Sequence, residues 1–220
     1  MKIKETDLAK IINDYFENIG LESYKEVSLK GKGGNIRCDS YIIKRQNDLI
    51  IDSFTIETKL NFSLKVIHQS YLWKNYSKRN YICIPKPKRK DMKLYNFSID
   101  ICKKMNIGIY IVDVFNKTVT EFFKPIDNNL NIKYPPLYEE QKKSEAGNDK
   151  SEYITSYKIT IKNLKEFLID KDWLDIKFVI ENIKHHYKNN NSAINSIKKY
   201  IYKNIITDIQ IQDNKIILKK

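Results

Sequence analysis

Residues 36–60 read IRCDSYIIKRQNDLIIDSFTIETKL and contain two runs rich in β-branched and aromatic residues. The runs occupy residues 37–44 and 49–60, and the residues between them, Arg-Gln-Asn-Asp at 45–48, are typical of a turn. We therefore expect a β-hairpin of two antiparallel strands. Because the two strands of a hairpin are neighbours in their sheet, this stretch sets the centre of the fold.

The sequence on either side of the hairpin predicts alternating helices and strands. Apolar residues at helical spacing, followed by Gly20, predict a helix at residues 7–19, and a strand is expected at 24–29. After the hairpin we expect helices at 64–77 and 94–105 and strands at 81–85, 107–114 and 118–123. This order predicts an α/β fold, with a mixed sheet flanked by helices.

The chain has 220 residues and a formal net charge of +13, which is unevenly distributed. Residues 1–125 carry 23 basic and 14 acidic side chains, residues 126–155 carry 4 and 6, and residues 156–220 carry 13 and 7. The middle segment contains Pro135-Pro136, Gly147 and a polar run, so we expect a linker between two basic domains. The charge favours a polyanionic partner such as nucleic acid, although AT-rich genomes also enrich lysine.

Residues 156–220 predict three helices followed by a short hairpin. The helices are expected at 161–169, 173–186 and 192–205, and the hairpin lies in IQIQDNKIILK at 209–219. This order resembles that of winged-helix domains, in which the third helix contacts DNA. The resemblance implies DNA contacts by Asn195, Lys198, Lys199, Tyr202 and Lys203 on that helix and by Lys215 in the wing. The alternative is that the helix pairs with another protein and that its lysines form a solvated face.

Hydropathy argues against a membrane-spanning protein, and cysteine usage argues against a disulfide-rich or cysteine-ligated metal protein. No run approaches the roughly 18 apolar residues that a membrane span needs, so we expect no membrane partner. Cys38, Cys83 and Cys102 are odd in number and widely spaced, and they form neither a CxxC metal motif nor a disulfide framework. We therefore expect a reducing, cytoplasmic environment.

Three residues of the hairpin predict a catalytic site. Asp39 lies in the first strand and Glu57 and Lys59 lie in the second, where alternation puts them on one face that Asp39 can reach by pairing. Two carboxylates supply the hard oxygen ligands that Mg²⁺ prefers, and the cation stabilises charge on a phosphoryl group. The lysine can orient or help deprotonate the attacking water. The alternative is a surface ion pair, which the apolar run around Glu57 disfavours.

An Asp on one strand followed by Glu-x-Lys on the next resembles the PD-(D/E)XK nucleases, which share the restriction-endonuclease-like fold. The element order of residues 7–85 is similar to that of the family's core. Gln69-Ser-Tyr-Leu-Trp73, on the next helix, is similar to a glutamine-and-aromatic motif of several branches. The similarity covers roughly residues 5–115. One departure is Cys38, since the family often has proline before the first aspartate.

The resemblance assigns roles to the residues of this motif. It implies that Asp39, Glu57 and the backbone carbonyl of Thr58 hold Mg²⁺ or Mn²⁺. It further implies that Lys59 is the catalytic lysine and that Gln69 supports the site or contacts the substrate.

Two sets of residues have more than one interpretation. The family's upstream acidic residue is either Glu26, which we favour, or Glu5 at the head of the first helix. Lys30, Lys32 and Arg37 flank a glycine-rich turn and are candidates for DNA phosphate contacts. The alternative is a basic hairpin that contacts nothing.

The sequence thus predicts a Mg²⁺-dependent DNA endonuclease, with a cleavage domain at residues 1–125 and a winged-helix-like domain at residues 156–220. The alternative is a non-catalytic DNA-binding or regulatory protein that retains a nuclease-like fold. The resemblance also allows for a homodimer, since many nucleases of this family dimerise to cut both strands.

Overall fold

The computed structural model describes residues 3–31, 34–87, 92–128, 130–144, 146 and 156–219, without the side chains of residues 30, 31 and 92–94. The chain divides into two compact units, Met1–Tyr153 and Ile154–Lys220. Separate clusters of buried apolar side chains lie within each unit. Each unit therefore has a hydrophobic core of its own.

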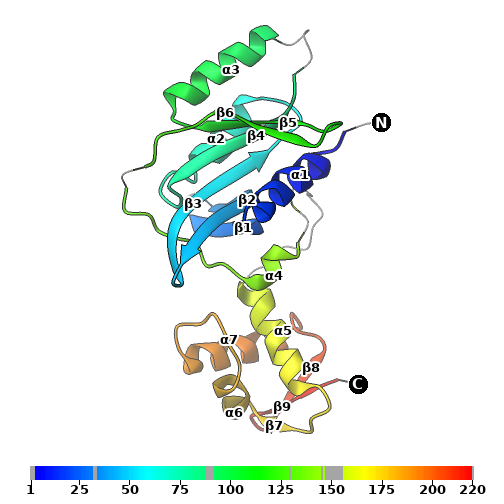
Figure 1. Ribbon diagram of the computed structural model, residues 1–220. Coiled ribbons are helices and arrows are strands. Elements are labelled where there is room, and N and C mark those ends of the chain that lie inside the picture. The colour runs from blue at the N-terminus through cyan, green and yellow to red at the C-terminus, as the bar shows by residue number, and fades with distance from the viewer. Residues whose placement is uncertain are drawn as a thin grey trace. The chain divides into compact units, whose positions relative to one another are not determined.

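The first unit is built on a six-stranded sheet in the order β1-β2-β3-β4-β5-β6 (Figure 1). Strands β1, β2 and β3 are antiparallel neighbours, β3, β4 and β5 run parallel, and β6 is antiparallel to β5. The strands span Glu22–Gly31, Gly34–Gln46, Leu49–Thr58, Arg79–Pro85, Gly108–Asp113 and Thr118–Phe123. The expected hairpin is β2 and β3, and the predicted α/β architecture with a mixed sheet is confirmed.

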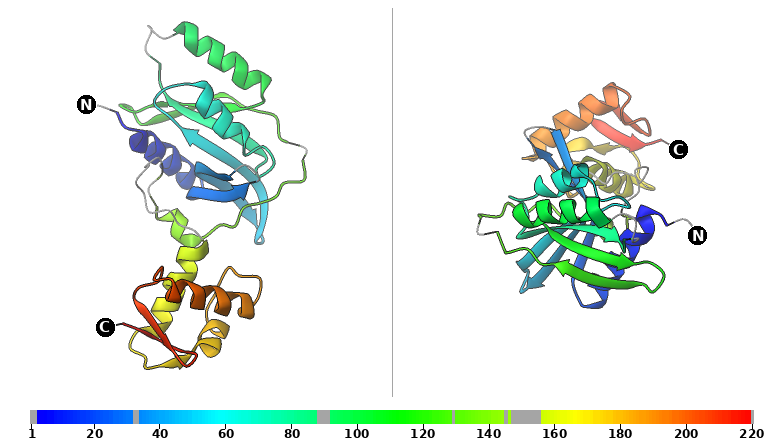
Figure 2. Two further views of the ribbon diagram at one scale, coloured as in Figure 1. Left: turned by 180° about the vertical axis from the view of Figure 1, so that it is seen from behind. Right: turned by 90° about the horizontal axis from the view of Figure 1, so that it is seen from above.

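Helices cover both faces of this sheet, with α1 on one face and α2 and α3 on the other (Figures 1 and 2). These helices span Glu5–Asn18, Leu64–Tyr71 and Met92–Lys104. The residues of β4 alternate accordingly, because successive side chains of a strand point to opposite faces. Tyr81 and Cys83 pack in the cluster that contains α1, and Ile82 and Ile84 pack in the cluster that contains α2 and α3.

The helix expected at residues 64–77 ends at Tyr71, so the prediction was too long and Trp73 lies outside the helix. Turns follow instead, and the Trp73 N–H donates to the Ser70 carbonyl (N···O 3.2 Å). Trp73 is fully buried in the cluster on β1 and β2, where its ring centroid lies 5.9 Å from that of Tyr41. The aromatic residue that extended the apolar pattern is thus a core residue of the turn.

Part of the segment expected as a linker at residues 126–155 packs on the first unit. The Asn128 N–H donates to the Lys78 carbonyl (2.8 Å), and Lys25 Nζ donates to the Lys142 carbonyl (2.7 Å). A short helix, α4 (Glu139–Lys142), contacts β1. Hydrogen bonds therefore hold this part of the polar segment on the first unit, so it is not a free connector.

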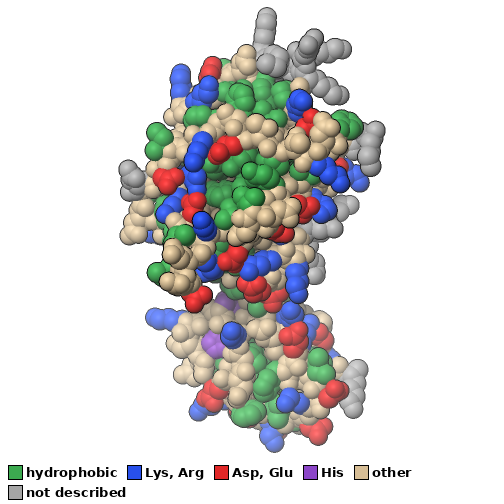
Figure 3. Space-filling model, in the orientation of Figure 1, with side chains coloured by type: hydrophobic (Ala, Val, Ile, Leu, Met, Phe, Trp, Pro, Cys, Tyr) green, Lys and Arg blue, Asp and Glu red, His purple; other side chains and the backbone are tan. Residues whose placement is uncertain are grey.

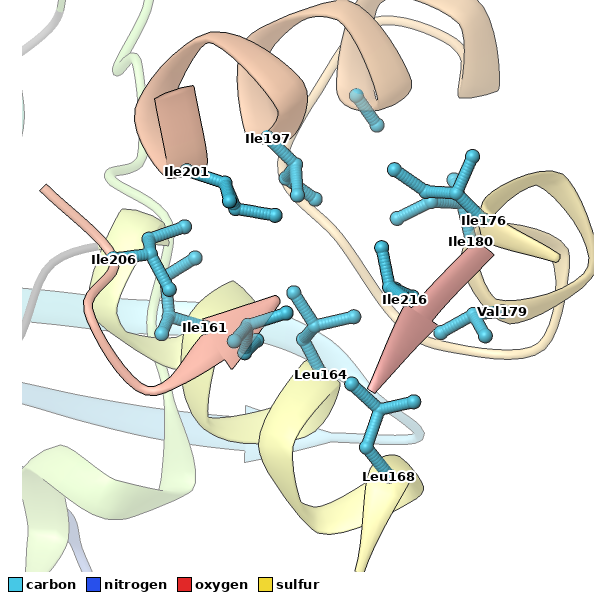
Figure 4. Close-up of a cluster of buried hydrophobic side chains, with 12 residues drawn as sticks. Ile161, Leu164, Leu168, Ile176, Val179, Ile180, Ile197, Ile201, Ile206 and Ile216 are labelled. Carbon is cyan, nitrogen blue, oxygen red and sulfur yellow. The ribbon is translucent and has the colours of Figure 1, made fainter. Parts of the chain in front are cut away.

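The second unit combines three helices with a small sheet of strand order β7-β9-β8. The elements are α5 (Ser156–Leu168), β7 (Leu174–Asp175), α6 (Ile176–Glu181), α7 (Asn190–Tyr202), β8 (Ile209–Gln212) and β9 (Lys215–Leu218). Its core brings Leu164 of α5, Ile180 of α6 and Ile197 of α7 together with Ile216 of β9 (Figure 4). All four side chains are at most 1% exposed.

The helix expected at residues 173–186 is shorter at both ends, because α6 covers only Ile176–Glu181. The Asp175 carboxylate accepts from the Lys177 and Phe178 N–H groups and so caps the helix at its first turn. Leu174 precedes this cap and pairs with Ile216 in the sheet instead. A capping aspartate inside an apolar pattern was the signal for the true start.

Replacing Ile197 by alanine should destabilise the second unit by about 2–5 kcal/mol, since it leaves a cavity in a close-packed core. Ile205→Ala provides the control, because Ile205 is 55% exposed and its truncation should change stability by less than about 0.5 kcal/mol. Urea denaturation of the full chain, followed by far-ultraviolet circular dichroism, measures both. Equal midpoints for the two variants would contradict this packing of the core.

Candidate active site: three carboxylates across β1, β2 and β3

A polar cavity of about 440 Å³ opens beside β2, β3 and α2 of the first unit. Four sequence-predicted residues, namely Asp39, Glu57, Lys59 and Gln69, line it. Arg37, a predicted DNA contact, lines it as well. The remaining lining residues are Glu5, Asn35, Ile36, Ser63, Lys65, Val66 and Leu72.

Sheet register places three carboxylates side by side on neighbouring strands. The pair Ser40↔Ile56 puts Asp39 of β2 opposite Glu57 of β3, one residue further along. Pairing of β1 with β2 on either side of Glu26 likewise puts Glu26 opposite Asp39. We call Glu26, Asp39 and Glu57 the carboxylate row. The three residues are 2%, 4% and 1% exposed, so the row is almost wholly buried.

Burial governs the ionisation of Asp39 and Glu57. Desolvation raises the pKa of Glu57 well above its usual value, and the nearby Asp39 and Glu26 raise it further. The pKa of Asp39 is also raised by burial, although Lys59, the Thr58 N–H and Arg37 oppose the change. That N–H donates to Asp39 Oδ2 over 2.7 Å. Within the described part of the chain, Glu57 Oε1 accepts no hydrogen bond.

Lys59 lies just past the end of β3 and extends into the cavity. Its backbone N–H donates to the Cys83 carbonyl (3.0 Å), which keeps this residue attached to β4. Its Nζ donates to Glu5 Oε2 of α1 (2.8 Å). Burial lowers the pKa of the ammonium, but Asp39, Glu5 and Glu57 outweigh that effect and raise it. Lys59 is therefore protonated at neutral pH.

The two candidates for the upstream acidic residue occupy different places. Glu5 lines the cavity and pairs with Lys59. Glu26 does not line the cavity, although it belongs to the row, and its Oε2 lies 3.0 Å from Arg37 Nε. Its backbone has a φ of 56°, in the left-handed region that a glutamate seldom adopts. Only Glu5 of the two thus faces the open space.

Helix α2 supplies the cavity wall opposite the sheet. Gln69 stands on this helix, and its Oε1 is buried without a hydrogen-bond partner among the described residues. Lys65 lies one helical turn earlier and lines the same wall, but sequence reasoning passed over it. Its spacing of four residues from Gln69 is the signal that could have found it, since such residues share a helix face.

The predicted DNA contacts of the second unit are largely exposed. Asn195, Lys199 and Tyr202 follow one another at helical spacing on α7, and Tyr202 is 70% exposed. Helix α7 ends at Tyr202, so Lys203 follows the helix instead of lying on it as expected. Lys203 and Lys215 are exposed too, whereas Lys198 is half-buried and donates to Asn214. On the face seen in Figure 3, basic and acidic side chains are interspersed. The basic surplus therefore forms no single patch in that view.

Two of the predicted contacts near the glycine-rich turn cannot be placed. Lys32 lies outside the described residues, and so does the side chain of Lys30. The three cysteines, Cys38, Cys83 and Cys102, are free and buried. Among the described helices, none is both long and apolar enough to cross a membrane.

Asp39 and Glu57 of the row provide oxygen ligands suited to a divalent cation. In the described ranges, no group of three or more His, Cys, Asp or Glu side chains is arranged as a metal site. The set expected from the sequence, however, contains only two carboxylates, Asp39 and Glu57, with the Thr58 carbonyl. Glu57 Oε1 is buried without a hydrogen bond from the described residues, and its neighbours repel its negative charge. A hard cation would relieve both conditions, so these residues fit Mg²⁺.

Comparison with models of known protein families and with curated proteins finds no match. The roles of these residues therefore rest on their geometry and chemistry alone.

Replacing Glu57 by glutamine should stabilise the fold at neutral pH. Because the folded-state pKa of Glu57 is raised above the usual 4.5, the protonated form is the more stable one. The protonated carboxyl therefore contributes fully to stability below pH 4.5, and this contribution is lost as the pH rises through the folded-state pKa. Thermal unfolding between pH 4 and 8 should show the advantage of Glu57→Gln growing with pH.

Asp52→Asn serves as the matched control, since Asp52 lies on the same strand and pairs with Arg79. This change removes an ion pair and should lower the melting temperature or leave it unchanged throughout that range. A Glu57→Gln protein that is less stable than wild type at pH 8 would contradict the electrostatic description of the row.

Proposed function

We propose that this protein is a metal-dependent DNA endonuclease whose first unit has the restriction-endonuclease-like fold. The observation that supports it best is the meeting of Asp39, Glu57 and Lys59 in one polar cavity, with both carboxylates at most 4% exposed. Buried carboxylates destabilise a fold, so the presence of two of them beside the ammonium of Lys59 favours a chemical role.

In this proposal Asp39, Glu57 and the Thr58 carbonyl hold Mg²⁺ or Mn²⁺. When bound, the cation supplies a water of lowered pKa and stabilises charge on the phosphate. Lys59 is protonated, so we assign to its ammonium the donation of a hydrogen bond to the phosphate or to the attacking water, rather than removal of a proton. Glu5 holds the ammonium in place. Gln69 can hydrogen-bond the substrate or a water from the opposite wall.

We assign DNA delivery to the second unit, as a winged-helix-like domain with α7 as its recognition helix. The element order of residues 156–219 and the exposed Asn195, Lys199 and Tyr202 of α7 support this role. Lysines in these positions can contact phosphates, and an exposed tyrosine can contact the sugar-phosphate backbone or a base.

The proposed activity is tested by incubating purified protein with plasmid DNA and Mg²⁺ or Mn²⁺. Wild type should nick or cut the DNA, and Asp39→Asn, Glu57→Gln and Lys59→Met should each lose at least roughly 100-fold in rate. Asp52→Asn, on the same strand as Glu57, should retain activity because Asp52 pairs with Arg79 away from the cavity.

Cleavage that persists in all three site variants would refute the assignment. Calorimetric titration with Mn²⁺ then addresses the non-catalytic alternative. Metal uptake that disappears in Glu57→Gln supports the enzyme. No uptake by wild type, even with DNA present, indicates a DNA-binding or regulatory protein instead.

DNA binding by α7 and the residue that caps its C-terminus is tested with the double variant Lys199→Ala, Lys203→Ala. Removal of each phosphate-binding lysine should flatten the slope of log affinity against log salt by roughly one, because fewer counterions are released. Lys177→Ala is the control, since Lys177 is also exposed but lies on α6. Fluorescence anisotropy with a labelled duplex measures the slopes. An unchanged slope in the double variant would exclude α7 as the contact surface.

A further inference from the structure

The antiparallel pair of β1 and β2 carries two arginine–glutamate ion pairs of similar N···O separation. Arg37 Nε lies 3.0 Å from Glu26 Oε2, and Arg45 Nε lies 3.1 Å from Glu22 Oε1. Their surroundings differ. The Glu22 side chain is 30% exposed, as expected for a surface pair, whereas that of Glu26 is 2% exposed. The first pair therefore combines a buried carboxylate with a partner that reaches solvent.

Several features of Glu26 are costly unless they serve a purpose. Its carboxylate is withdrawn from water beside two others, and its φ of 56° is unfavourable for a residue with a side chain. A buried ion pair is in itself weak support for a fold, because desolvation offsets the attraction between the charges. Stability alone thus gives no reason for a glutamate at this position.

The partner of Glu26 faces the candidate active site. Arg37 lines the cavity with 31% of its side chain exposed, and it lowers the pKa of both Asp39 and Glu57. A guanidinium has five N–H donors, more than a single carboxylate can accept. Its planar fork matches the oxygens of a phosphate, and holding the fork in place reduces the entropy lost on binding.

We propose that Glu26 is a positioning residue that orients Arg37 toward a backbone phosphate of the nucleic acid in the cavity. This inference rests on the proposed function, and it gives Glu26 a different role from the upstream catalytic acid expected from the sequence. Arg37 makes the contact and Glu26 acts through it. The acids that hold the cation are then Asp39 and Glu57.

Fluorescence anisotropy of a labelled DNA duplex, with Ca²⁺ in place of Mg²⁺, tests the contact. Arg37→Gln should weaken binding about tenfold, because it removes one bidentate hydrogen-bonding group. Glu26→Gln should weaken it by a smaller factor, and the double variant should bind no more weakly than Arg37→Gln alone. The matched controls, Arg45→Gln and Glu22→Gln, should stay within about twofold of wild type.

Calorimetry with Mn²⁺ separates positioning from metal ligation. Glu26→Gln should bind Mn²⁺ as wild type does, whereas Glu57→Gln should not. If Glu26→Gln abolishes Mn²⁺ binding, or if Arg37→Gln binds DNA like wild type, the inference is wrong. Arg37→Lys preserves the charge beside Glu26 and guards against misfolding. It should fold with wild-type stability and still bind less tightly, because an ammonium lacks the planar fork.

The outcomes also separate this inference from the endonuclease assignment. Loss of binding in Arg37→Gln, by a protein that never cleaves, would uphold the phosphate contact and refute the nuclease. Cleavage that requires Asp39 but is unchanged in Arg37→Gln would support the nuclease and refute the phosphate contact.

Discussion

Three carboxylates on adjacent strands of one sheet are the constraint around which the first unit is organised. Neighbouring strands lie about 4.8 Å apart, and the negative charges of Asp39 and Glu26 both raise the pKa of the buried Glu57. Cationic side chains lie at both ends of the row and offset this repulsion. Arg37 pairs with Glu26, and Lys59 lowers the pKa of Asp39 and Glu57. Without this compensation the sheet would carry isolated buried charges.

The compensation ties distant parts of the chain to the site. Lys59 leaves β3 just after Glu57 and meets Glu5, which opens helix α1. Helix α1 is fixed in turn by Leu8 and Ile12, which pack on the sheet. The position of the lysine therefore depends on apolar packing as well as on charge. Such a site lowers the stability of the ionised fold, a cost that proteins accept where chemistry requires it.

The sequence predicted that Asp39 could reach Glu57 across the hairpin, but their direct pairing depends on a register shift between Lys44 and Arg45 that no local pattern marks. The sequence also could not predict the conformation of Glu26, since nothing in SYKEVSL indicates that one residue has a positive φ. Trp73 extended an apolar pattern that belongs partly to a helix and partly to a turn. Local spacing does not distinguish these two kinds of burial. The contacts of residues 126–144 could not be predicted either, because hydrogen bonds of this kind produce no periodic pattern in the sequence.

A Glu-x-Lys motif has little meaning by itself in a chain with 40 basic residues, so its weight comes from the burial of Glu57. Both units have a basic surplus, but they use charge differently. The second unit exposes Lys199 and Tyr202 on α7, whereas the first buries acids beside its cavity. Lys59 and Arg37 lower the pKa of Glu57, so the first unit offsets the charge of its buried acids with side chains of its own.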